Sequence, residues 1–293
     1  MNQRNPAIFH GDWLDLRAEA DSRARSRELE FHLARHLQRA RNDVLEPLVC
    51  VDLAGGSGNN VRHLAPRLPG AQHWKILDRD ARLLDRALES CRNLVAGDGT
   101  AVRVDTHLVD LADPTEVLSE SCRLLSASAL LDLVSENWLD TLGQALGRRP
   151  VPVLFALTVN GHWQFIDSQG ISTGDDSDEQ VRSLFNAHQR RTKGMGQALG
   201  PDAGATAARI LEQAGLEVRH EASSWKLPAG SRLATGLGRE LVSGWADAAA
   251  EQAPEHDARI RQWLQVRLES LESGELGIEV GHDDLLALPP LRA

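Results

Sequence analysis

Short apolar runs alternate with amphipathic stretches over the first half of the chain. Five of these runs are long enough for buried strands, at 47–53, 72–77, 101–109, 122–127 and 151–159. Between them, apolar residues recur at spacings of three and four, as in the stretch from Asp80 to Ala87, where the acid can cap a helix. Strands that alternate with helices form a parallel sheet with helices on both faces. The fifth run is continuously apolar, which predicts a central strand buried on both sides.

The pattern changes after residue 159. Asn160 and Gly161 predict a turn that folds 162–166 back as a hairpin partner. We expect the residues that follow, over 161–210, to include a polar loop, a helix at 179–191 and a glycine-rich segment at 192–201 that covers a substrate. The remaining pattern predicts a helix at 203–214, a strand at 216–220, a helical insertion over about 229–272 and a seventh strand near 276–280.

Composition and charge narrow the class of protein. The chain has 293 residues, 42% of them hydrophobic and 25% charged, which is ordinary for a globular protein. Its net charge of −10 disfavours a nucleic-acid partner, because such binding depends on neutralising phosphates. No apolar run approaches the roughly 20 residues that span a bilayer, and no leader opens the chain. With three cysteines that lack metal spacing, we expect a cytoplasmic protein with no membrane partner, and we allow for a homodimer.

The stretch from Val51 to Asn60, VDLAGGSGNN, carries the clearest chemical signal. It predicts a strand that bears an acid, a tight glycine turn and the start of a helix. Glycines let backbone N–H groups approach a ligand, and a helix N-terminus favours negative charge. A dinucleotide site would require a third glycine where Val61 stands, and a phosphate loop would require a nearby lysine. The segment therefore predicts a site for a nucleotide-like cofactor of another kind.

The stretch resembles the first motif of class I S-adenosylmethionine (SAM) methyltransferases, acid-x-G-x-G-x-G. Asp52, Gly56 and Gly58 match this motif, and Ala54 stands where the first glycine is usual. The resemblance covers roughly residues 45–160. It implies an α/β fold with a Rossmann-like, mostly parallel seven-stranded sheet and helices on both faces, to which this chain adds an N-terminal helix and inserted helical segments. It also implies SAM as the cofactor and a last strand that pairs antiparallel at the edge of the sheet.

Acids at the ends of the next strands extend the resemblance. Asp78 ends the second strand, where such folds hold the ribose hydroxyls, and Asp110 ends the third, where the family places the adenine against an apolar residue, here Leu111. The resemblance thus implies these cofactor-binding residues: Asp52, Ala54, Gly55, Gly56, Gly58, Asn60, Asp78, Arg79, Asp110, Leu111 and Ser126.

The N-terminal stretch allows two interpretations. Residues 12–42 are strongly charged and helical, with an apolar side that includes Trp13, Phe31 and Leu37. In many methyltransferases of this architecture an N-terminal helix lies over the cofactor cleft. Alternatively, the helix merely packs on the sheet, which is the interpretation we favour. We divide the chain into this segment, 1–45, and one methyltransferase domain, 46–293, whose cofactor half is 46–160.

Candidate residues for the chemistry are less clearly marked. Methyl transfer needs mostly positioning and, for some acceptors, removal of a proton. We take His188 and His162 as candidate catalytic bases, because histidine titrates near neutral pH. His282 is a further candidate. For each histidine the alternative is a hydrogen-bonded structural role. The candidates for substrate binding are Trp163, Gln189 and Trp138. For Trp138 we favour the alternative, a place in the core.

Absent motifs favour a small-molecule acceptor. After the fourth strand there is no Asn/Asp-Pro-Pro-aromatic turn of the kind found in amino-methyltransferases of nucleic acids, and no cysteine nucleophile follows a proline. The sequence shows no clear set of oxygen ligands for a metal ion. The sequence therefore favours a SAM-dependent methyltransferase of a small molecule. The alternative is a SAM-binding, non-catalytic assembly subunit with the same fold, and an NAD-dependent oxidoreductase is disfavoured by Val61.

Overall fold

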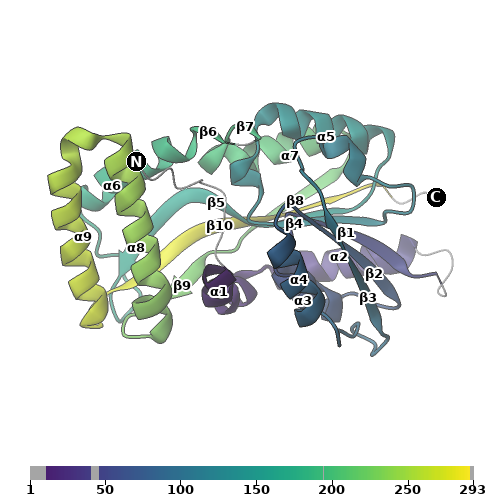
Figure 1. Cartoon of the computed structure of the whole chain (residues 1–293), viewed down its shortest axis with the longest axis horizontal. Helices are drawn as coiled ribbons and strands as arrows, with labels where there is room; N and C mark the ends of the chain where they lie inside the picture. Colours follow the sequence, from purple (N-terminus) through teal and green to yellow (C-terminus); the bar gives the residue numbers. More distant parts are fainter. Residues whose placement is uncertain (1–10, 41–45, 194, 291–293) are drawn as a thin grey trace.

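The structure is a computed structural model that describes residues 11–40, 46–193 and 195–290. One large sheet runs through the centre of the molecule, with helices on both of its faces (Figure 1). No helix in these ranges is long and apolar enough to cross a membrane.

Seven strands form the main path of the sheet, in the order β3-β2-β1-β4-β5-β10-β8. Neighbouring strands from β3 to β5 are parallel, whereas β10 is antiparallel to both β5 and β8. A further short strand, β9, pairs with β10, and β6 and β7 form a separate small hairpin. The predicted fold class, a mostly parallel seven-stranded sheet of the Rossmann type, is confirmed. The strand bounds are β1 Leu48–Leu53, β2 Gln72–Asp78, β3 Val102–Leu108, β4 Leu124–Ser128, β5 Val153–Ile166, β6 Thr192–Lys193, β7 Gly196–Gln197, β8 Glu217–Ala222, β9 Trp225–Leu227 and β10 Gly277–Leu288.

Two predictions about the strands are wrong. No hairpin turn forms at Asn160 and Gly161, because β5 continues through both residues as one strand of 14 residues. Gly161 adopts a φ of +78°, and the register with β10 shifts opposite it, so the pair forms a bulge instead of a turn. The last strand is also not at the edge of the sheet, since β10 lies between β5 and β8.

The helices cover the sheet in two layers. Alternate side chains of each strand point to opposite faces, so that Val51 and Leu53 pack beneath α5 and α7, whereas Cys50 packs with α2, α3 and α4. Trp74 and Ile76 of β2 join the second of these cores and are fully buried. The helix bounds are α1 Gly11–Ala24, α2 Arg27–Ala40, α3 Asn59–Leu64, α4 Ala81–Ser90, α5 Glu136–Arg148, α6 Asp176–Gln189, α7 Ala203–Gln213, α8 Arg232–Gln252 and α9 Asp257–Glu272.

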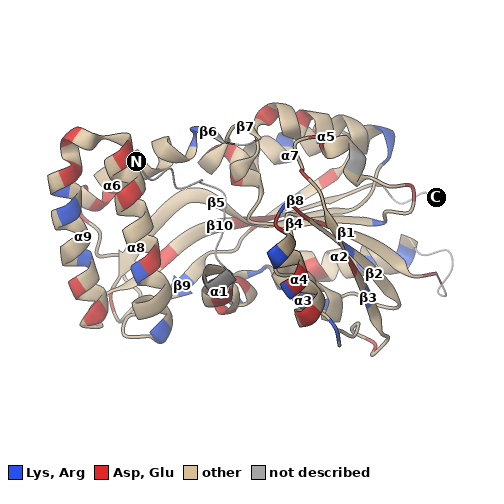
Figure 2. Ribbon diagram, viewed as in Figure 1, with Lys and Arg blue, Asp and Glu red and all other residues tan. Residues whose placement is uncertain are grey.

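A third core lies where β5 and β10 extend beyond the other strands. There α6, α8 and α9 surround the strand ends, and α8 and α9 form the predicted helical insertion (Figure 1). Trp163 of β5 stacks on Trp245 of α8 at 4.1 Å between ring centroids, with 9° between the ring planes. Both signs of charge alternate along α9 (Figure 2), while its buried residues, such as Trp263, face this core.

The N-terminal segment is two helices with a break at Arg25 and Ser26. The second helix, α2, packs on the sheet through Leu29 and Leu33, as we expected. The first, α1, lies instead against α3 and β9 (Figure 1). At the break, the buried carboxylate of Asp284 on β10 accepts a hydrogen bond from the Ser26 N–H at 2.9 Å, and a second from the Leu157 N–H of β5 at 2.8 Å.

We predict that Asp284→Ala lowers the free energy of unfolding by about 2–4 kcal/mol, because two N–H groups lose their acceptor and a buried countercharge disappears. Urea unfolding followed by tryptophan fluorescence measures this loss. Glu275→Ala, which removes an exposed acid near the start of the same strand, is the control and should stay within about 0.5 kcal/mol of wild type. Equal effects of the two substitutions would contradict the role of Asp284.

Candidate functional site

A cavity of about 320 Å³ opens at the carboxyl ends of β1 and β4 and beside the middle of β5. Residues of α1 form one part of the cavity wall, and the glycine loop with the start of α3 forms another part. Ligands of open α/β sheets bind at this edge of the sheet. The lining residues are Leu14, Arg17, Ala18, Asp21, Ser22, Arg25, Ala54, Gly55, Gly56, Ser57, Asn59, Asn60, Arg62, His63, Arg67, Ser128, Ala129 and Leu157.

Backbone strain is concentrated at this cavity. Over the described ranges, three residues other than glycine have positive φ: Ala54 at 49°, Ala129 at 53° and Leu157 at 54°. All three line the cavity, although Ala54 follows β1, Ala129 follows β4 and Leu157 lies within β5. Such conformations cost about 1–3 kcal/mol each and persist only where the surroundings fix them. Here the Ala129 N–H donates to the Ala156 carbonyl at 2.9 Å, and Asp284 holds Leu157.

The glycine loop takes the form that its sequence predicts, but its glycines differ in role. Gly56 has a φ of +52°, and a Cβ there would lie 3.4 Å from Leu14 of α1, so its missing side chain leaves room between loop and helix. A Cβ on Gly55 would lie 2.5 Å from the Asp52 carboxylate beneath the loop. Gly58 does not line the cavity, since its Cβ would meet Cys91 of α4 at 2.9 Å. Gly58 therefore allows α3 to approach α4, and its role in cofactor binding stays a prediction.

Asp52 lies fully buried beneath the loop. Its Oδ1 accepts a hydrogen bond from Asn60 Nδ2 at 2.5 Å, and the same Nδ2 lies 2.7 Å from Ser126 Oγ, whereas Oδ2 has no hydrogen-bond partner. Burial raises the pKa of Asp52 from 3.8 to about 7, although the Asn60 hydrogen bond and the charge of Arg25 oppose the rise. The structure thus brings together Asp52, Asn60 and Ser126 as a buried polar support for the loop.

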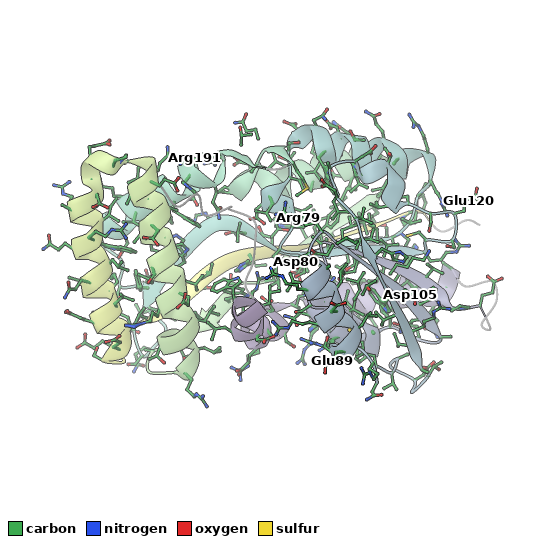
Figure 3. All side chains as sticks on the ribbon, in the orientation of Figure 1. Arg79, Asp80, Glu89, Asp105, Glu120 and Arg191 are labelled. Atoms are coloured by element: carbon green, nitrogen blue, oxygen red, sulfur yellow. The ribbon has the colours of Figure 1, made fainter. Side chains whose placement is uncertain are left out.

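Asp78, Arg79 and Asp110, which we also expected to bind the cofactor, do not line the cavity. Asp78, at the end of β2, accepts hydrogen bonds at 2.9 Å from the N–H groups of Gly56 and Asp80. Arg79 is exposed beside Asp80 at the start of α4 (Figure 3). Asp110 is exposed and accepts from the Ala112 N–H at 3.2 Å.

Leu111 and Trp138 belong to the core. Leu111 is buried, and its carbonyl accepts a 2.6 Å hydrogen bond from Trp138 Nε1. Trp138 itself is 3% exposed among the side chains between sheet and α5. The hydrogen bond from Trp138 therefore holds the loop after β3 against the core. Trp138 is not among the residues that line the cavity.

The candidate catalytic histidines lie outside the cavity lining. His188 Nε2 lies 3.0 Å from Glu251 Oε2 of α8, and this pair joins α6 to α8. His162 is exposed on β5. His282 is buried with Nδ1 3.0 Å from the Val280 carbonyl, and burial lowers its pKa to about 3, so it stays neutral near pH 7.

The predicted substrate residues lie elsewhere too. Trp163 is in the third core, where its ring stacks on Trp245, and Gln189 ends α6. No described residue of 161–210 lines the cavity. The segment that we expected to cover a substrate therefore does not form the wall of this cavity. We also find no group of three or more His, Cys, Asp or Glu residues in the described ranges that could hold a metal ion.

Sequence reasoning missed the wall that α1 contributes. Leu14, Arg17, Ala18 and Asp21 recur at spacings of three and four, which places them on one face of α1, and all of them line the cavity together with Arg25 just after the helix. This periodicity was readable in the sequence, but it does not say which surface the face contacts. Our preference for a helix packed only on the sheet is therefore wrong for α1.

A buried polar network lies behind this wall. Glu30 of α2 contacts His63 Nε2 at 2.6 Å through Oε1 and Arg67 Nε at 3.0 Å through Oε2. Burial lowers the pKa of His63, and the hydrogen bond with Glu30 opposes this shift. His63 Nδ1 lies 3.2 Å from Ser22 Oγ, so both ring nitrogens of the one histidine in the cavity wall are engaged.

No family model and no curated protein matches the sequence, but solved structures resemble the fold. The cyclopropane synthase MmaA2 of Mycobacterium tuberculosis is 11% identical, with 98% of this chain and 100% of that chain covered and a TM-score of 0.47. A putative sarcosine dimethylglycine methyltransferase of Galdieria sulphuraria is 12% identical, with 95% and 97% covered and a TM-score of 0.42. Phosphoethanolamine N-methyltransferase 2 of Haemonchus contortus, solved with SAM, is 14% identical with a TM-score of 0.40. The match covers 97% of this chain and 61% of that one. Because these TM-scores lie below 0.5, we base no conclusion about activity on them.

We predict that Asp52 makes stability depend on pH. Its pKa is raised in the folded state, so its protonated form contributes stability that is fully present below about pH 4 and lost as the pH rises through about 7. Between pH 5 and pH 8, the free energy of unfolding should fall by about 2–3 kcal/mol more in wild type than in Asp52→Asn, which cannot titrate. Urea unfolding at both pH values measures this difference, and parallel pH profiles of the two proteins would contradict it.

Proposed function

We propose that this protein is a SAM-dependent methyltransferase that acts on a small-molecule acceptor. The observation that carries the proposal is the convergence of a glycine loop and three strained residues from β1, β4 and β5 on one cavity beneath α1. Strained backbone conformations cluster at ligand-binding and active sites, so their presence here indicates a binding site. The acid-x-x-x-G-x-G pattern of this loop supports SAM over other nucleotide ligands.

The residues present fit this cofactor. Gly56 leaves the space beneath Leu14 open, and the loop from Ala54 to Ser57 lines the cavity. Asp78 is the candidate for the ribose hydroxyls, because it already lies at the loop and accepts from its backbone. Asp110 and Leu111 follow β3 and are the candidates for the adenine.

The bound cofactor would supply a methyl group activated on a sulfonium. The work of the chain is then to position the acceptor, for which the part of the lining formed by Ser128, Ala129 and Leu157 is the candidate surface. α1 would exclude water from the same space. His63 has both nitrogens engaged and is not assigned as a base. The catalytic roles of His162 and His188 stay predictions, and methyl transfer as proposed requires neither.

The alternative, a SAM-binding assembly subunit without activity, would share the cofactor site. Transfer of labelled methyl groups from SAM into a pool of small metabolites separates the two hypotheses, because only the enzyme labels an acceptor. The homodimer, the cytoplasmic location and the lack of nucleic-acid and membrane partners stay predictions.

We predict that the chain binds SAM with a Kd in the micromolar range, or about −8 kcal/mol, and that it does not bind NAD at similar concentrations. The physical reason is that the turn lacks the third glycine that brings a helix close to a dinucleotide. Isothermal titration calorimetry with each ligand measures both affinities. Binding of NAD without binding of SAM would refute the proposed function.

We predict that Asp78→Ala weakens SAM binding by about 10- to 100-fold, since a carboxylate that can accept from ribose hydroxyls is lost. Asp98→Ala is a matched control, because Asp98 also accepts from two backbone N–H groups, those of Gly70 and Thr100, but lies outside the cavity lining. Calorimetry should show nearly unchanged SAM affinity for this control. If Asp78→Ala also binds as tightly as wild type, Asp78 does not hold the ribose.

A further inference from the structure

Arg25 is a buried cation in the cavity wall with unused hydrogen-bond donors. It is 6% exposed and stands at the break between α1 and α2. Its Nη1 donates to Asn60 Oδ1 at 2.6 Å, and Asn60 is itself a lining residue, so the guanidinium end lies at the cavity. Its Nε and Nη2 are buried and have no hydrogen-bond partner among the described residues. Burying an arginine with two unpaired nitrogen donors costs folding free energy unless a ligand supplies a hydrogen-bond acceptor.

The carboxylates nearest to Arg25 are committed to other groups. Glu30 Oε1 and Asp284 Oδ2 lie 3.7 and 3.8 Å from Nε, which is close enough for attraction but beyond hydrogen-bond distance. Glu30 is engaged by His63 and Arg67, and Asp284 by two backbone N–H groups. These carboxylates balance the charge of the guanidinium, but they form no hydrogen bond with its Nε or Nη2.

The other arginines of the wall are less suited to this role. Arg17 is bound to Asp21 through three hydrogen bonds of 3.0–3.2 Å. Arg67 is paired with Glu30, and Arg62 is hydrogen-bonded to Asn59. Arg25 is therefore the arginine of this wall that combines deep burial with partnerless donors. A planar guanidinium in such a position matches the geometry of a carboxylate.

We propose that Arg25 binds the carboxylate at the amino-acid end of the cofactor, which rests on the proposed function and extends it to an orientation. The sulfonium of SAM is a cation, so a buried guanidinium disfavours its approach to this end of the cavity. With the carboxylate at Arg25, the sulfonium lies at the other end of the amino-acid chain of the cofactor, away from the guanidinium. Arg25 thus sets both affinity and direction, while Glu30, Asp284 and Asn60 position its guanidinium.

A carboxylate at Arg25 could also belong to the acceptor, and binding without any acceptor separates these sources. The ligands are S-adenosylhomocysteine and its decarboxylated analogue, which keeps the adenosine, the thioether and the amine but lacks the carboxylate. Calorimetry on the full chain compares wild type, Arg25→Met and Arg25→Lys. Arg62→Met is the matched control, because it removes a cavity arginine whose side chain is already hydrogen-bonded.

In wild type, we expect S-adenosylhomocysteine to bind about 10- to 100-fold more tightly than the decarboxylated analogue. Arg25→Met should abolish this ratio by weakening only the carboxylate-bearing ligand. Arg25→Lys, which keeps the charge for Glu30 and Asp284 and so protects the fold, should leave an intermediate ratio. Arg62→Met should keep the ratio within about threefold of wild type, because the Arg62 guanidinium is already hydrogen-bonded to Asn59.

Three results would overturn the inference while leaving the proposed function intact. These are equal affinity of wild type for both ligands, an unchanged ratio in both Arg25 variants, or equal weakening of both ligands by Arg25→Lys, which would make Arg25 a structural residue. If wild type binds neither ligand, the proposed function itself fails. The two failures are therefore distinguishable.

Discussion

The hydrogen bonds of one buried carboxylate connect the parts of this protein that have to meet at the cavity. Asp284 belongs to the one reversed strand of the sheet, and it accepts from the backbone of β5 on one side and from the break between α1 and α2 on the other. The first bond holds Leu157 at a positive φ. The second fixes the point at which the chain leaves α1 and enters α2. Because the carboxylate and the Leu157 N–H are buried, loss of this acceptor leaves a polar group without a partner inside the protein.

A second buried acid supports the opposite wall. Asp52 holds Asn60, and Asn60 in turn accepts from Arg25, so a chain of side chains joins the floor of the glycine loop to the helix that covers it. One consequence is that the protonation of Asp52 and the charge of Arg25 influence each other, since the arginine favours the ionised acid. The glycine loop and the end of α1 are therefore coupled electrostatically, although they lie about 30 residues apart in sequence.

The reversed position of β10 explains the shape of the rest of the molecule. A long strand that pairs with β5 along most of its length extends the sheet beyond the parallel strands, and the exposed apolar face of this extension requires its own cover. α6, α8 and α9 supply it, with Trp163 and Trp245 in contact at its centre. Of the candidate substrate and catalytic residues, Trp163 lies in this third core and His188 pairs with Glu251 between α6 and α8, whereas Trp138 belongs to the core beneath α5. Their chemical types are explained there by packing and ion pairing.

The sequence by itself determined the parallel half of the sheet and the glycine loop, because both depend on local rules. Strand periodicity, the helix cap at Asp80 and the need for glycine at positive φ act within a few residues of one another. Only the tertiary structure decided that β10 enters the interior of the sheet, that Gly58 serves helix packing, and that α1 forms the cavity wall. Each of these outcomes depends on which surfaces meet across more than 30 residues of chain, and a helical face such as that of Leu14, Arg17 and Asp21 has the same periodicity whatever it contacts.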